Sequence, residues 1–180
     1  YVGSGRSFGN FDVTSALHHV STHLEKFGGH PQACGFSIRG EDNLKLVVDA
    51  LHAFALENIK PEDLIPHLDI EKELTLEEID WALFDSLERC RPFGQGNSEP
   101  VFSSCELTLV SFATVGNEGK HLRLSVRSPQ GRILPAIAFG FGDRAPNLIL
   151  GQSIDLAFHV RVNEWNGNRE LQLQVEDINV

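Results

Sequence analysis

The second half of the chain contains five β-rich runs separated by turn residues, and this pattern constrains the fold more than any other feature. The runs cover residues 101–112, 121–127, 133–139, 154–162 and 171–178. Glycines lie between the first four, and Asn166-Gly167 gives the last two the signal of a tight hairpin. A short helix is predicted over 143–148, between the third and fourth strands. Five strands with a helix at that position are the plan of an OB-fold, a small barrel that often binds single strands.

The first 90 residues follow a mixed pattern of helices and strands instead. Asp12 is the predicted N-cap of a helix over 13–25, which Gly28-Gly29 would end. Apolar spacing predicts the later elements: a strand over 33–38, a helix over 41–57, a half-buried strand over 68–74 and a helix over 76–90. The chain is therefore predicted to be α+β, with a small α/β domain over 1–66, a connecting strand, helix and turn over 67–100, and a five-stranded OB-fold β-barrel over 101–180.

The net charge of −10 opposes binding of a polyanion, so the distribution of the charge along the chain matters. Residues 41–90 contain four basic and fourteen acidic groups, whereas residues 1–40 contain three and two, and residues 91–180 contain eight and nine. Binding of a polyanion by counterion release depends on the local density of positive charge at the contact surface, and not on the net charge of the whole chain. The two flanks therefore remain candidates for a nucleic-acid interface.

Membrane, disulfide and zinc chemistry are not indicated. No apolar run approaches the roughly 18 residues that a membrane helix needs. The three cysteines are odd in number and far apart, which indicates a reduced, cytoplasmic compartment and favours small core residues: Cys34, Cys90 and Cys105. His19 and His23 have the spacing of zinc ligands but lack the accompanying glutamate, so together with His18 they are interpreted as exposed helix residues.

Two glycine-rich stretches contain the residue types of a phosphate-binding site. The first, at 3–7, contains a predicted loop over Ser4–Ser7 that supplies two hydroxyls and one guanidinium. The second, at 28–30, combines bare backbone N–H groups with an imidazole. Structural alternatives stay open, namely a helix C-cap for the glycines, a carbonyl partner for the imidazole and a surface ion pair for the guanidinium. The candidate residues are Ser4, Arg6, Ser7, Gly28, Gly29 and His30.

Basic residues near a tryptophan form a second candidate surface, in the barrel half. Trp165 precedes the Asn-Gly turn, where its indole would either stack on a base or pack against the first domain. Arg123 and Arg127 share one face of their strand by alternation. Phe139 is predicted to be core, although it could also offer a stacking surface. Solvated surface charge would also explain each of the basic residues singly. The candidates for binding a single strand here are Lys120, Arg123, Arg127, Arg161, Trp165 and Arg169.

Four motifs, in their order along the chain, resemble the RecJ family of single-strand-specific 5′→3′ DNA exonucleases, which belong to the DHH superfamily. They are Gly-Ser-Gly-Arg-Ser at 3–7, Gly-Gly-His-Pro-Gln-Ala-Cys-Gly at 28–35, Pro-Phe-Gly-Gln-Gly-Asn at 92–97 and Asn-Glu-Trp-Asn-Gly at 163–167. The resemblance spans residues 3–178. In one departure, Cys34 stands where alanine is common in the family, a small change that should leave the approach of a ligand to the backbone intact.

The resemblance implies that the first half is a DHHA1 domain and the second half is the family's OB-fold. It also implies that the catalytic DHH domain, with its bound manganese or magnesium, lies outside this sequence, in which neither an Asp-His-His triplet nor a methionine occurs. The chain is accordingly interpreted as a segment of a longer protein. By the same resemblance, Ser4 and Arg6 would hold the 5′-terminal phosphate, and Gly28, Gly29 and His30 would lie near the scissile phosphate, where His30 would act as a catalytic contact.

The expected function is the substrate-binding portion of a RecJ-like single-strand-specific 5′→3′ DNA exonuclease, gripping single-stranded DNA for a missing two-metal domain and inactive alone. From the family, single-strand-binding protein is a further expected partner. Two alternatives are a stand-alone single-strand-binding or partner-docking module without enzyme activity, and a DHHA1-type phosphodiesterase of short oligonucleotides. The barrel after residue 100 argues against the phosphodiesterase.

Overall fold

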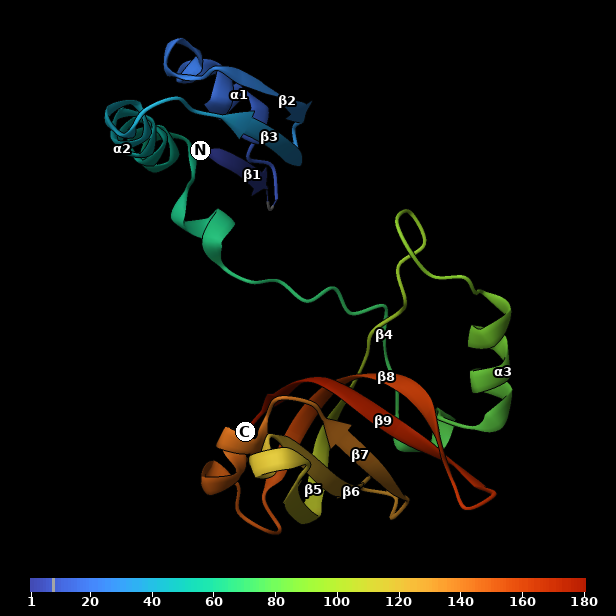
Figure 1. Ribbon diagram of the computed structural model, residues 1–180. Coiled ribbons are helices and arrows are strands. Elements are labelled where there is room, and N and C mark those ends of the chain that lie inside the picture. Colours follow the sequence, from blue (N-terminus) through green and yellow to red (C-terminus); the bar gives the residue numbers. More distant parts are fainter. Residues whose placement is uncertain (8) are drawn as a thin grey trace. The chain divides into compact units, whose positions relative to one another are not determined.

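The computed structural model describes residues 1–7 and 9–180, without the side chain of Trp165, and divides the chain into two units (Figure 1). The first unit comprises Tyr1–His67 and the second Leu68–Val180, and each has its own hydrophobic core. Among the described residues, no helix combines the length and the apolar character that a membrane crossing requires.

A three-stranded antiparallel sheet is the frame of the first unit. Its strands are β1 (Val2–Arg6), β2 (Lys26–His30) and β3 (Ala33–Ser37), in the order β1-β3-β2. β2 and β3 form a hairpin with Pro31-Gln32 as its turn. Two predictions were wrong: residues 4–6 are strand instead of loop, and Gly28-Gly29 lie inside β2 instead of at a helix end. Pairing with β3 satisfies the backbone groups of both flanking strands that face β3, and this outweighs the low strand propensity of glycine.

The first helix, α1 (Val13–His19), begins at the predicted N-cap. The Asp12 carboxylate accepts hydrogen bonds from the N–H groups of Thr14 and Ser15, at 2.8 and 3.1 Å. Hydrogen bonds from the Thr14 hydroxyl and from Ser15 lower the pKa of Asp12 to about 2, so the cap is charged at neutral pH. The helix is shorter than predicted, because it ends at His19 and is followed by a 3₁₀ turn, η1 (Ser21–His23), before β2 begins at Lys26.

The helices pack on one face of the sheet. α2 (Glu41–Asn58) and η2 (Pro61–Leu64) complete the elements of this unit. The core residues, with those packed against them, are Val20, Ile38, Val47, Leu24, Phe36, Leu44, Ala50 and Leu51. Phe36 of β3 points into this core, and Phe27, its neighbour on β2, contacts the His18 ring of α1. The helices therefore cover the Phe36 face and leave the other face of the sheet uncovered by α1 and α2.

The second unit is a closed five-stranded barrel with one short additional strand. The strands are β4 (Lys72–Glu73), β5 (Phe102–Val115), β6 (His121–Arg127), β7 (Ile133–Ala138), β8 (Ser153–Trp165) and β9 (Asn168–Asn179). Neighbours pair in the order β5-β6-β7-β9-β8, and β8 pairs again with β5, which closes the barrel. β4 adds to β5 in parallel. The predicted OB-like barrel and its hairpin at Asn166-Gly167 are confirmed.

Short helices connect the strands of the barrel. They are η3 (Leu76–Glu78), α3 (Trp81–Arg89), η4 (Asn117–Gly119) and η5 (Gly142–Asn147). η5 lies between β7 and β8, where the sequence predicts a short helix. The helix predicted over 76–90 is divided, because Asp80 caps α3 by accepting a hydrogen bond from the Leu83 N–H at 2.8 Å. The strand predicted over 68–74 is reduced to β4, because only Lys72 and Glu73 pair with the start of β5.

Alternation along the strands fills the barrel interior. Leu122, Leu124 and Val126 of β6 are fully buried, and they share one core with Phe158 of β8. Burial of each such side chain contributes about 1.5–3 kcal/mol. Because these side chains point into the packed interior, the residues that alternate with them along each strand point outward.

Candidate nucleic-acid interface

The strand register places the two glycine-rich stretches side by side on the uncovered face of the three-stranded sheet. Ser4 of β1 lies opposite Gly35 of β3, and Gly35 lies opposite Gly28 of β2. One row further along, Arg6 and His30 flank β3 in the same way. Because directly opposed residues point to the same side of a sheet, these residues share one face. The sequence predicts them as one site, and the register brings them together.

We call this surface the open face. Its nine residues are Val2, Ser4, Arg6, Lys26, Gly28, His30, Ala33, Gly35 and Ser37. Three of them are basic and none is acidic, in a unit with five Lys and Arg and eight Asp and Glu residues. In the described part of the chain, no ion pair involves Arg6, Lys26 or His30. The open face is therefore a local positive surface on an acidic protein.

Two glycines of the open face have no internal reason to be glycine. A Cβ atom on Gly28 would meet no atom within 4 Å, and one on Gly35 would meet only the Gly3 carbonyl oxygen, at 3.9 Å. Neither residue has a positive φ. Glycine inside a strand costs about 0.5–1 kcal/mol relative to alanine. Such a glycine often marks a site where a ligand approaches the backbone closely.

Glycine on the opposite face is required by packing. A Cβ on Gly3 would lie 2.4 Å from the ring of Phe36. Gly29 has a φ of 149°, and a Cβ there would lie 2.3 Å from the Ala33 carbonyl oxygen. Gly28 and Gly29, which are adjacent in the sequence and were predicted to act together, thus have different roles.

The free edge of β2 adds backbone donors. Alternate N–H groups of an edge strand point away from the sheet, so β2 still offers backbone donors beside the open face.

Backbone hydrogen bonds hold Arg6 beside His30. The carbonyls of the Pro31-Gln32 turn accept two hydrogen bonds of 2.9 Å, from the N–H groups of Ser7 and Val13. The Ser7 hydroxyl, a predicted phosphate donor, donates a hydrogen bond to the backbone carbonyl of Phe11, which precedes α1. That hydroxyl therefore helps to fix the connection between β1 and α1, instead of facing a ligand.

The barrel presents a second candidate surface. Arg123 and Arg127 are exposed and point outward from β6, so their predicted shared face is confirmed. Arg123 lines a groove of about 620 Å³ whose other residues are Ile137, Phe139, Asn163, Asn168, Glu170 and Gln172. Phe139 is 55% exposed, and the prediction that it is core was wrong. The inward residues of β7 are at 134, 136 and 138, so strict alternation would have placed Phe139 outside.

The exposed phenyl ring of this groove is held in place. Phe139 and His121 meet edge to face, with ring centroids 5.2 Å apart. The N–H of Gly140 donates to Nδ1 of His121 at 3.0 Å, which orients the imidazole. An exposed aromatic ring beside a cation such as Arg123 is the arrangement on which a base stacks while its phosphate is neutralised.

Two other basic candidates of the barrel have partners within the chain. Lys120 lies 3.5 Å from the carboxylate of Glu118. The guanidinium of Arg169 lies over the indole of Trp81, 5.3 Å from the ring centre, and so ties the β8–β9 hairpin to α3. The predicted stacking residue Trp165 ends β8, but its side chain lies outside the described residues.

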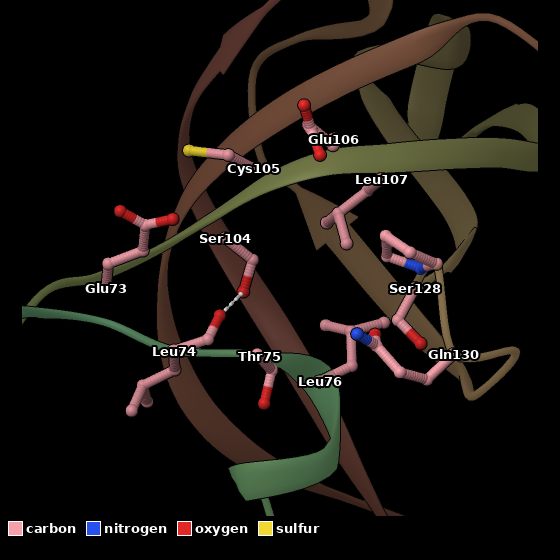
Figure 2. Close-up of a pocket in the computed structure, with 11 residues that line it drawn as sticks. Glu73, Leu74, Thr75, Leu76, Ser104, Cys105, Glu106, Leu107, Ser128 and Gln130 are labelled. Atoms are coloured by element: carbon pink, nitrogen blue, oxygen red, sulfur yellow. Dashed lines mark hydrogen bonds between the residues drawn. The ribbon is translucent and has the colours of Figure 1, made fainter.

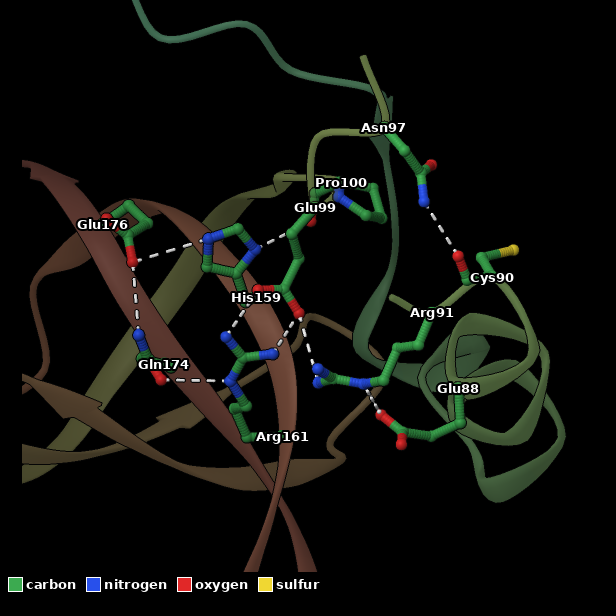
Figure 3. A network of polar contacts seen from close by, with 10 residues as sticks. All are labelled: Glu88, Cys90, Arg91, Asn97, Glu99, Pro100, His159, Arg161, Gln174 and Glu176. Atoms are coloured by element: carbon green, nitrogen blue, oxygen red, sulfur yellow. Dashed lines mark hydrogen bonds and ion pairs between the residues drawn. The ribbon is translucent and has the colours of Figure 1, made fainter. Parts of the chain in front are cut away.

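Arg161 is the centre of a half-buried polar network (Figure 3). Its guanidinium donates to both carboxylate oxygens of Glu99, and its Nε donates to Gln174 at 3.1 Å. The hydrogen bonds from Arg161 hold the pKa of Glu99 below its usual value. Arg91 lies 3.6 Å from the same carboxylate, so the network fixes the 91–100 turn to the barrel. The guanidinium of Arg161 is therefore engaged by Glu99 and is not free for a phosphate, contrary to the sequence prediction.

We expect Arg161→Gln to lower the free energy of unfolding of the barrel by about 1–3 kcal/mol, because Glu99 loses charge-assisted hydrogen bonds in a half-buried place. The affinity for single-stranded DNA should stay the same. Urea denaturation and fluorescence anisotropy measure the two quantities. Arg123→Gln is the matched control, expected to keep the stability and to reduce the affinity. Loss of affinity in Arg161→Gln at unchanged stability would contradict this assignment.

A pocket of about 360 Å³ between β4 and β5 is poorly suited to phosphate (Figure 2). Glu73, Cys105 and Glu106 line it. Partial desolvation, and then the neighbouring carboxylates, raise the pKa of the Cys105 thiol, so that thiol stays protonated at neutral pH. Cys34 is buried as predicted, whereas Cys90 and Cys105 are exposed. The core prediction was wrong for these two, because one caps α3 and the other lies at a bulge of β5.

The described residues do not fit a metal centre. Within 1–7 and 9–180, no three His, Cys, Asp or Glu side chains are grouped as a metal ion requires. His18 and His19 instead contact Phe27 and Phe54, each with ring centroids 5.0 Å apart.

Comparison with known proteins agrees with this architecture. The DHHA1 domain model matches residues 1–57, and the RecJ OB domain model matches residues 70–177. The single-stranded-DNA-specific exonuclease RecJ of Haemophilus influenzae is 32% identical over 98% of this chain and 31% of its own length. RecJ of Bacillus subtilis is 26% identical over 97% of this chain and 22% of its own length. The chain thus spans less than a third of these curated relatives.

A solved structure shows the same fold. The crystal structure of Thermus thermophilus RecJ with Mn²⁺ superposes with a TM-score of 0.80 at 23% identity, over 99% of this chain and 25% of that chain. The RecJ OB domain model alone covers more than half of the sequence. The chain therefore belongs to the RecJ family, with a DHHA1 domain followed by the family's OB domain.

Proposed function

We propose that this chain is the substrate-binding part of a RecJ-type, metal-dependent 5′→3′ exonuclease and that it grips a single DNA strand for a DHH domain outside this sequence. The open face is the observation that carries the proposal. Arg6 and His30 flank it without any ion-pair partner among the described residues, and Gly28 and Gly35 leave its centre free of side chains. The relatives are named as single-stranded-DNA-specific exonucleases, and two Thermus RecJ structures were solved with Mg²⁺ or Mn²⁺.

Each residue has a proposed role. Arg6, with the hydroxyl of Ser4, holds the 5′-terminal phosphate through paired N–H donors. His30 lies near the scissile phosphate and stabilises the charge that develops there. The groove at Arg123 and Phe139 binds a more distant part of the strand. Because the described residues hold no metal centre, the chain alone is proposed to bind without cleaving. Its three unpaired cysteines support a reducing, cytoplasmic location.

We expect the chain to bind single-stranded DNA better than duplex DNA and to prefer a 5′-phosphorylated end. The expected preference is about tenfold or more, because a charge-assisted phosphate contact is worth about 1.5–3 kcal/mol. Arg6→Ala should remove this preference, because it removes that contact. Fluorescence anisotropy with labelled oligonucleotides measures both affinities. Arg39→Ala is the control, since Arg39 is exposed on the same unit but paired with Glu25. An unchanged 5′-phosphate preference in Arg6→Ala would refute the proposed role of Arg6.

A further inference from the structure

We propose that Lys26 binds a second, internal phosphate of the same DNA strand, at the end of the open face away from Arg6. This inference rests on the proposed function, because it needs a strand that already lies on the open face. It adds a length requirement, since Lys26 would contribute only to oligonucleotides that extend beyond the nucleotides held at Arg6 and His30.

The strand register carries the first step. Lys26, Gly28 and His30 occupy every second position of β2, so their side chains point to the same face. His30 lies four residue steps along the antiparallel strand from Lys26, a distance of about 14 Å. A stacked strand advances only about 3.4 Å per nucleotide. A phosphate at Lys26 and a phosphate at the Arg6 row therefore belong to different nucleotides.

The path between the two cations of the open face, Lys26 and Arg6, is free of side chains that would obstruct a strand. Gly28 separates Lys26 from His30 along β2, and Gly35 occupies the adjacent position on β3. A Cβ atom at Gly28 would meet nothing within 4 Å. A phosphodiester backbone can therefore lie against the sheet along its whole length between the two cations.

The electrostatics around Lys26 favour an external anion. No carboxylate in the described part of the chain forms an ion pair with Lys26. The carboxylate next to it in sequence, Glu25, is paired with Arg39. Ser37 lies directly opposite Lys26 on β3 and adds a hydroxyl donor on the same face. An ammonium and a hydroxyl side by side form a site for a second phosphate.

Anisotropy titrations of the whole chain over a salt series test this inference. The probes are a 5′-phosphorylated oligothymidylate long enough to cover the open face and, by competition, a 5′-phosphorylated dinucleotide. Lys26→Gln should lower the affinity for the long probe roughly threefold to tenfold. It should also reduce the slope of log K against log salt by about 0.7, as expected for one lost phosphate contact on a single strand. The affinity for the dinucleotide should not change.

The control variant is Lys45→Gln, because Lys45 is exposed on α2, away from the open face. The inference is overturned if Lys26→Gln binds the long probe as tightly as Lys45→Gln does. It is also overturned if Lys26→Gln lowers the affinity for the dinucleotide as much as the affinity for the long probe. If Arg6→Ala loses affinity while Lys26→Gln does not, only the Lys26 site fails. If neither variant differs from the parent chain, or if the parent chain binds no DNA, the proposed function fails together with this inference.

Discussion

Gly35→Val should remove most of the affinity for single-stranded DNA and leave the protein folded. The open face has its barest point at Gly35, between Ser4 and Gly28. Valine is a good strand former, and its Cβ would meet only an ordinary contact at 3.9 Å, so the stability should stay the same or rise. Its methyl groups would hold the phosphate backbone away from the sheet. Loss of even one charge-assisted hydrogen bond, at about 1.5–3 kcal/mol, would weaken binding about tenfold or more.

A second glycine provides the control for this substitution. Gly94 also has open space around its Cβ position, but it lies in the 91–100 turn and not on the open face. Gly94→Val should therefore change neither affinity nor stability. Anisotropy and thermal unfolding report on the two quantities. If Gly35→Val binds DNA as tightly as the parent chain, the phosphate backbone does not approach the sheet at this row.

Gly29→Ala should have the opposite effect, a loss of stability in the first unit. Gly29 has a φ of 149°, and an added Cβ would lie 2.3 Å from the Ala33 carbonyl oxygen and 2.6 Å from Cys34 Cα. Both contacts are with backbone, which cannot move aside without disturbing the β2–β3 hairpin. Strain and overpacking together cost roughly 2–5 kcal/mol. Urea denaturation, with hydrogen exchange of the β3 amides, measures the change.

Gly28→Ala is the matched control, because it adds the same methyl group to the neighbouring residue of the same strand. It should leave stability unchanged or raise it by about 0.5–1 kcal/mol. Equal stability of the Gly28→Ala and Gly29→Ala proteins would contradict the register of the hairpin, and with it the composition of the open face.

The barrel was predictable from the sequence, because its strands alternate regularly and turn residues punctuate them. The small sheet was only partly predictable. Residues 26–30 have a single apolar side chain, so no periodic pattern marks them as a strand, and only pairing with β3 makes them one. For the same reason the sequence placed Gly28 and Gly29 at a helix end.

The residue types of the candidate site were predictable, but their availability was not. Arg161 and Arg123 look alike in the sequence, and only the fold brings Glu99, 62 positions away, onto Arg161. Lys26 is an ordinary surface lysine until the register places it in line with Gly28 and His30. Phe139 is different, because strict alternation along β7 would have placed it outside.

The most direct test of the central claim is a nuclear magnetic resonance titration of the ¹⁵N-labelled chain with a 5′-phosphorylated single-stranded oligonucleotide. We predict that the amide shifts change at the open face, above all at Ser4, Arg6, Gly28, His30 and Gly35, and that resonances around Phe139 change as well. The amide shifts of α2, which packs on the other side of the sheet, should not change. Shift changes confined to α2 or to the barrel, with an unaffected open face at saturation, would contradict the account.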